Sequence, residues 1–140
     1  MKYILVLLLM ILMHIFADYH LQGILASMKQ KSWWIDQCKA DDEKYRNDYK
    51  AALIAHSFEW SFLMMIPIFI LKNPMNYSLG ETICFLWMLI LNVVIHAVVD
   101  HAKANLHTIN LILDQAMHYF QIVSTWMIFT IHFADLVIHL

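Results

Sequence analysis

Between residues 14 and 118 of the chain, three pairs of one histidine and one aspartate recur, with the two residues four positions apart. The pairs are His14 and Asp18, His96 and Asp100, and Asp114 and His118. Residues four positions apart lie on the same face of an α-helix, so each pair can direct an imidazole and a carboxylate the same way. Such nitrogen and oxygen ligands suit Zn²⁺, with Mn²⁺ and Fe²⁺ as alternatives. The spacing therefore predicts a divalent-metal site.

A fourth histidine, His56, lies in a separate apolar segment and completes the predicted ligand set. The expected metal ligands are His14, Asp18, His56, His96, Asp100, Asp114 and His118. Because this set is larger than one tetrahedral site needs, we expect one or two divalent ions, most readily zinc. Such an ion lowers the pKa of a bound water and makes a hydroxide nucleophile at neutral pH. The set thus points to metal-dependent hydrolysis.

Other polar residues near these pairs are expected to contact the ligands or a substrate. They are Gln22, Glu59, Asn92, His101, Lys103 and Gln115. The expected catalytic residues are Asp18, Asp100, Lys103 and Gln115. Lys103 is expected to bind an anionic group such as a phosphate, although a lysine that extends to the membrane interface is an equal alternative.

The segments that carry these residues are strongly apolar. Of the 140 residues, 61% are hydrophobic and 14% are charged, whereas soluble domains carry about 25% charged residues. Four segments, near residues 3–28, 51–71, 82–100 and 108–134, approach the roughly 20 residues that a membrane-spanning helix needs. The sequence predicts an all-α fold, an integral membrane four-helix bundle in one domain covering residues 1–140.

In a bundle whose helices alternate in direction, the predicted ligands fall at one depth, in the half of the membrane next to the first and third loops. Ionisable residues in a bilayer are costly and usually mark function, which favours a shared site over a purely structural polar core. A purely structural polar core is the alternative to a shared functional site. The repeated His-x3-Asp spacing at His14 and His96 also suggests two duplicated helical hairpins.

The charged loop 29–50 holds six of the nine Lys and Arg residues. We expect a solvated helical hairpin or short amphipathic helix there, with a lid over a substrate or partner as the alternative. The first and third loops together hold seven basic residues, against two elsewhere. This bias places those loops in the cytoplasm and both termini outside, whereas Lys2 ahead of an apolar run favours the reverse.

Thiol labelling tests this orientation. Cys38, in the first loop, should react from the cytoplasmic side, and a cysteine placed near Asn76 should react from outside. The opposite pattern would show that Lys2 or the charged loop sets the orientation. Cys84 lies on the other side from Cys38 in this topology, so no disulfide is expected.

Two other interpretations were weighed against the membrane bundle. The first segment resembles a cleaved secretory signal, but cleavage near Ala17 would separate His14 from Asp18. A soluble helical bundle conflicts with the apolar fraction.

The net charge of −2, without a basic stripe, predicts no nucleic-acid partner. The expected partner is the lipid bilayer, and a homo-oligomer is left open.

The order of these motifs along the chain resembles one family. The motifs are His14-x3-Asp18-x2-Leu21-Gln22, His56, His96-x3-Asp100-x2-Lys103 and Asp114-Gln115-x2-His118. Over nearly the whole chain they resemble small bacterial and phage membrane proteins catalogued as domain of unknown function 3307. The resemblance implies a helical bundle in the bacterial inner membrane and supplies no reaction. The chain is also loosely similar to small membrane metal-dependent hydrolases. It lacks the His-Arg pair that begins their first motif.

We therefore expect a membrane-embedded metal-dependent hydrolase that acts on a lipid-linked or phosphorylated substrate. The alternative is a non-enzymatic membrane protein with the same polar core: a small transporter, a proton or metal conductor, or a phage-type accessory protein. A conductor needs polar residues that continue to the other membrane face. Residues 64–71 and 122–131 are almost wholly apolar, which favours a one-sided site.

Overall fold

The computed structural model describes residues 2–38, 43–71 and 77–134. Within these ranges every regular element is a helix and no strand is found, which confirms the all-α prediction. The elements are α1 (Lys2–Phe16), a π-helical turn (Ala17–Leu21), α2 (Leu25–Met28), α3 (Lys31–Cys38), a 3-10 turn (Glu43–Tyr45), α4 (Asp48–Leu71), α5 (Leu79–Ala104) and α6 (Leu111–Ala134).

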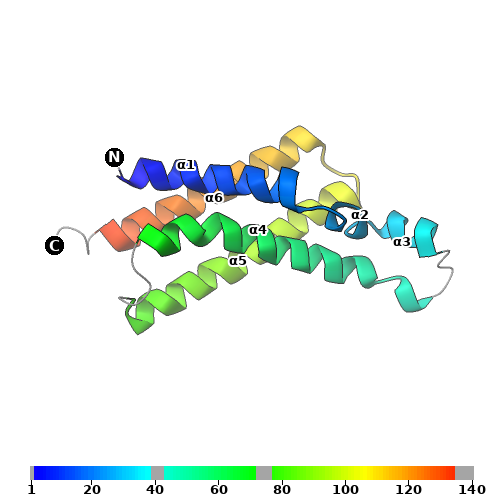
Figure 1. Cartoon of the computed structure of the whole chain (residues 1–140), viewed down its shortest axis with the longest axis horizontal. Coiled ribbons are helices and arrows are strands. Elements are labelled where there is room, and N and C mark those ends of the chain that lie inside the picture. The colour runs from blue at the N-terminus through cyan, green and yellow to red at the C-terminus, as the bar shows by residue number, and fades with distance from the viewer. Residues whose placement is uncertain (1, 39–42, 72–76, 135–140) are drawn as a thin grey trace.

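The four long helices lie side by side and run alternately in opposite directions (Figure 1). α1 contacts α4 and α6, and α5 contacts the same two helices, so the four close into a ring. The short helices α2 and α3 lie toward the end of the ring that is away from the start of α1. This arrangement turns one face of every long helix toward a common interior.

The first predicted helix, 3–28, is wrong as a continuous element. The α-helical hydrogen bonds end at Phe16 and give way to the π-helical turn, which is followed by a break before α2. Gly23 lies in this break with a φ of 48°, a left-handed conformation that other residues seldom adopt. A π-helical turn also widens the helix locally, and such turns are frequent at functional sites. The break lets α2 lie across the end of the interior.

The starts of the last two long helices are set by side-chain caps. Ser78 and Glu81 form a reciprocal capping box, so α5 begins at Leu79, three residues before the predicted boundary. The Asn110 Oδ1 atom accepts a hydrogen bond from the Leu113 N–H, and α6 begins at Leu111 rather than at residue 108.

The ring buries a cluster of polar side chains, while much of its outer surface is apolar. Buried polar residues in the ring include six histidines and aspartates, namely His14, His56, His96, Asp100, Asp114 and His118. Large apolar side chains on the outer faces are exposed, as in Trp87 (67%), Ile112 (80%) and Phe120 (75%). Contiguous apolar exposure on this scale marks a surface that meets a membrane or a partner.

Three helical segments are long and apolar enough to cross a membrane, judged by length and composition: Lys2–Leu21, Asp48–Ile70 and Leu79–Ala104. α6 is 24 residues long but is not among them. Polar residues lower the hydropathy of its sequence, and Asp114, His118 and Gln121 among them are buried in the ring. The predicted fourth span therefore has an exposed apolar surface but does not reach the mean hydropathy of a candidate span.

Candidate metal centre

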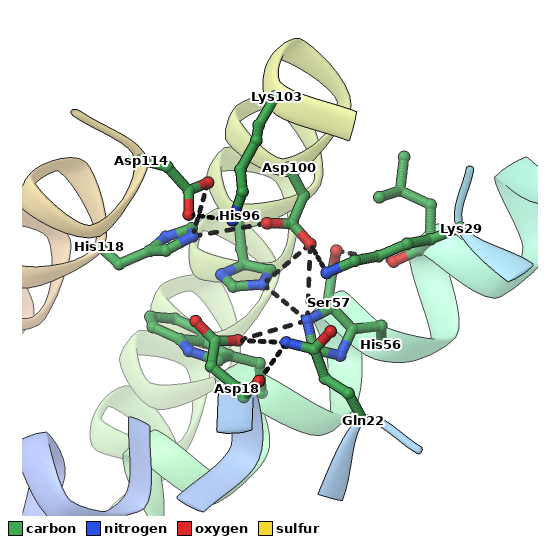
Figure 2. Close-up of polar contacts among 12 residues, drawn as sticks. Asp18, Gln22, Lys29, His56, Ser57, His96, Asp100, Lys103, Asp114 and His118 are labelled. Atoms are coloured by element: carbon green, nitrogen blue, oxygen red, sulfur yellow. Dashed lines mark hydrogen bonds and ion pairs between the residues drawn. The ribbon is translucent and has the colours of Figure 1, made fainter. Parts of the chain in front are cut away.

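The side chains of the predicted ligands meet in the interior of the ring. Asp18 comes from the π-helical turn, His56 from α4, His96 and Asp100 from α5, and Asp114 and His118 from α6. Figure 2 shows these six side chains directed toward one another. The Asp18 side chain is 6% exposed and the other five are buried. The spacing argument thus identified residues that the fold brings together.

One group of four ligand atoms centres on His56. Its Nε2 atom lies 3.4 Å from Asp18 Oδ1, 3.5 Å from Asp100 Oδ2 and 3.3 Å from His96 Nε2. His96 Nε2 lies 3.7 Å from Asp100 Oδ2. Four ligands about 2.0–2.1 Å from a tetrahedral zinc ion lie roughly 3.3–3.4 Å from one another. The atoms of Asp18, His56 and His96 all lie within 4.8 Å of one another, so these three residues could hold one zinc-sized cation together. Asp100 joins this first group through its contacts with His56 and His96.

A second group overlaps the first and centres on His118. The Nε2 atom of His118 lies 3.5 Å from Asp100 Oδ1 and 3.5 Å from Asp114 Oδ1. His96, Asp100 and His118 also offer three ligand atoms that all lie within 4.8 Å of one another. Asp100 therefore directs one carboxylate oxygen to each group, as a carboxylate that bridges two ions would.

Two atoms of this second group are buried without a hydrogen bond to any residue that the structure describes. They are His118 Nε2 and Asp114 Oδ1, which face each other across 3.5 Å. Leaving a buried polar atom unsatisfied costs about 1–3 kcal/mol, so native structures seldom keep two in contact without a reason. A cation between them would bind both atoms. The donor chemistry of the second group therefore also fits a divalent metal.

His14 is the predicted ligand that neither group includes. The Trp60 indole N–H donates to its Nδ1 atom at 2.8 Å, and its Nε2 atom lies 3.1 Å from Gln115 Oε1. Because the indole can only donate, His14 carries its proton on Nε2 and donates it to Gln115. Both ring nitrogens are engaged, so His14 holds its neighbours in place instead of binding a metal.

The orientation of two ligand imidazoles is fixed by ring stacking. The Trp60 ring stacks on His96 with centroids 4.2 Å apart, and His96 stacks on His118 at the same distance. The Nδ1 atoms of these two histidines make no hydrogen bond with the described residues. Metal-binding histidines usually donate that N–H to a partner, so here packing does the orienting. Trp60 was missed, although it lies four residues after His56.

Two lysines reach into the cluster, Lys29 from the right and Lys103 from the top of the view in Figure 2. The Lys29 ammonium donates to Asp100 Oδ2 at 2.5 Å, and the Lys103 ammonium donates to Asp114 Oδ2 at 2.7 Å. The expectation that loop 29–50 is solvated is wrong for Lys29, which is 8% exposed. The carboxylates of Asp18, Asp100 and Asp114 carry three negative charges, and the two lysines neutralise two of them. One negative charge therefore remains unmatched while the histidines are neutral.

Asn105 explains why Lys29 lies inside the protein. Its side-chain amide donates to the Lys29 carbonyl at 3.0 Å and accepts from the Lys31 N–H at 2.7 Å. These two bonds hold the chain after α2 against the end of α5. Lys29 is thereby fixed over Asp100, and no periodic pattern in the sequence could have shown it.

Replacing Asn105 with alanine should release this segment. We expect faster amide exchange at residues 25–31 and a lower melting temperature, because two hydrogen bonds, each contributing about 1 kcal/mol, are lost. Hydrogen–deuterium exchange of the detergent-purified protein measures this. Gln30→Ala is the matched control, since that exposed amide bonds only within its own turn, to Ala26. Equal exchange in the two variants would refute the clamp.

The residues expected near the ligands divide into two sets. Gln22 donates to Asp18, and the Gln115 amide lies 3.4 Å from Asp18 Oδ2 and 3.1 Å from Asp114 Oδ2. Lys103 also contacts the cluster. The other three lie elsewhere. Asn92 bonds to Gln121 and Thr125, and His101 stacks on Tyr49. Glu59 is half-buried and lies outside both ligand groups.

No family model, curated protein or solved structure matches this chain. Its functional assignment therefore rests on the chemistry of the cluster.

Proposed function

We propose that the chain is an integral membrane protein in which α1, α4, α5 and α6 all span the bilayer as a four-helix bundle. Three of these helices have the length and composition of spans. α6 exposes large apolar side chains such as Ile112 and Phe120, while its polar residues face the interior. In lipid this distribution is favourable, because ionisable groups are sheltered by neighbouring helices. The family resemblance implies the bacterial inner membrane, which we propose as its location.

The proposed activity is metal-dependent hydrolysis of a phosphorylated or lipid-linked substrate. The observation that carries it is that Asp18, His56 and His96 offer three ligand atoms that all lie within 4.8 Å of one another, as do His96, Asp100 and His118. The two overlapping groups have room for one or two ions. When bound, zinc supplies a hydroxide nucleophile at neutral pH.

The chain's own residues have separate parts in such a hydrolysis. Asp18 and Asp100 hold the cation, and Gln115 orients the Asp18 carboxylate. Lys103 supplies positive charge where an anionic group of the substrate would lie. In the net reaction the scissile ester bond breaks, the hydroxyl of water goes to the acyl or phosphoryl group, and its proton goes to the leaving oxygen. No step consumes an oxidant or reductant.

Elemental analysis of the detergent-purified protein tests the proposal most directly. We expect about one or two zinc ions per chain after purification without chelator, lost on dialysis against chelator. A chain that stays metal-free when zinc is supplied, yet remains folded, would exclude the hydrolase.

A metal-free polar core is the second candidate. It is favoured by the two lysine–carboxylate pairs, which neutralise Asp100 and Asp114 without a cation. A conducting path has less support. The network of Asn92, Gln121 and Thr125 extends the polar interior beyond the cluster. Past it, the core is filled by buried apolar side chains, among them Met10, Met64, Met65, Ile68 and Phe129.

A further inference from the structure

A second feature of the interior is a polar cavity of about 320 Å³ beside the cluster. Its polar lining consists of Gln22, Lys29, Gln30, Asp100, Lys103 and His107. These residues come from the break after the π-helical turn, from the turn after α2, and from the last turns of α5 and the loop that follows. The cavity therefore lies between the metal centre and the loop end of the bundle, and its volume is in the range of small-ligand sites.

The charges around this cavity favour an anion. Two ammonium groups and three further polar side chains line it, against the single carboxylate of Asp100. In the structure both ammonium groups are held by carboxylates of the metal centre. A divalent cation bound to Asp100 and Asp114 would take over the neutralisation of those carboxylates. Lys29 and Lys103 would then be free to turn toward an anion in the cavity.

We propose that this cavity binds the phosphate group of the substrate, held by Lys29 and Lys103 beside the metal centre. The inference rests on the proposed function, because the cation is what releases the lysines. Lysine is a common phosphate ligand that acts as a compact point charge. Asp100 belongs both to the cavity lining and to the ligand group that it forms with His96 and His118, so a phosphate here would lie next to the bound cation. The substrate class is thus a phosphate ester.

Calorimetric titration of the zinc-loaded protein in detergent tests this with two probes. Inorganic phosphate tests the shared chemistry, and dihexanoyl phosphatidic acid adds a lipid tail. We expect Lys103→Gln to weaken phosphate binding about tenfold or more, since a charge-assisted bond contributes about 1.5–3 kcal/mol. Lys50→Gln, which removes an exposed lysine on α4, should leave the affinity unchanged. Lys29→Gln should act like Lys103→Gln.

Zinc content is measured on every variant, so that the two proposals fail separately. Zinc-loaded protein that binds neither probe, or that binds them equally well after Lys103→Gln, would overturn the phosphate site and leave the metal centre standing. If no zinc binds, the hydrolase fails, and titration of the metal-free protein decides the cavity. If the metal-free protein binds phosphate and Lys103→Gln weakens this binding, the phosphate site is supported. If the metal-free protein binds no phosphate, the phosphate site is refuted. Binding of phosphatidic acid alone would identify a lipid headgroup as the source of the phosphate.

Discussion

Replacing Asp100 with alanine should abolish metal binding and lower the free energy of unfolding by about 3–5 kcal/mol. Its side chain is 4% exposed and lies within 3.7 Å of His56, His96 and His118. It provides an oxygen to each ligand group, so its loss removes a ligand from both. It also leaves the buried Lys29 ammonium without its partner. The cost of that unpaired charge explains why the change should destabilise the fold even without metal.

Asp100→Asn separates these two effects. The amide keeps the volume and can accept a hydrogen bond from Lys29, so we expect part of the stability to return while zinc content stays low. Glu59→Gln is the control, a half-buried carboxylate on α4 that neither group includes. Elemental analysis and thermal unfolding in detergent give both quantities. Zinc retained in both Asp100 variants would place the ligands elsewhere.

His118→Ala should release the ion of the second group while the first group keeps its own. His118 takes no part in the first group, and His56 takes no part in the second. Zinc content should therefore fall from about two ions per chain to about one in His118→Ala or in His56→Ala, and close to none when both changes are combined. The alanine also leaves Asp114 Oδ1 facing a space instead of an imidazole.

The contrasting case is His14→Ala, which should keep its zinc. That histidine bonds Trp60 and Gln115 with its two ring nitrogens, so its removal lowers stability through lost hydrogen bonds and lost packing. If His56→Ala and His118→Ala each empty the centre completely, the two groups share a single ion. If His14→Ala empties it instead, the assignment of His14 as a positioning residue is wrong.

The sequence predicted the parts of the centre that follow helical geometry. His96 and Asp100, four residues apart on α5, point the same way because the helix has 3.6 residues per turn. His118 and Asp114 do so on α6. The capping box at Ser78 was equally local, since its bonds join residues three apart. Features of this kind need no knowledge of how the helices meet.

The features that were missed depend on contacts between distant segments. Lys29 reaches Asp100 across 71 positions of sequence, and Asn105 holds it there across 76. A lysine in a run of charged residues has no periodicity to distinguish it from its solvated neighbours. The π-helical turn was missed because Ala17–Leu21 has ordinary helix-forming residues, and only Gly23 marks the break that follows.

The polar residues of α6 have a consequence for how such a chain enters a membrane during synthesis. An aspartate costs about 2.5–3.5 kcal/mol at the centre of an isolated inserted helix, and Asp114 lies in the first turn of α6. α6 leaves the ribosome after Lys103 of α5 has been made. The 2.7 Å bond between Lys103 and Asp114 joins these two helices across a short turn. On the proposed topology α5 and α6 would therefore insert together as a paired hairpin, with the ion pair formed before either charge meets hydrocarbon.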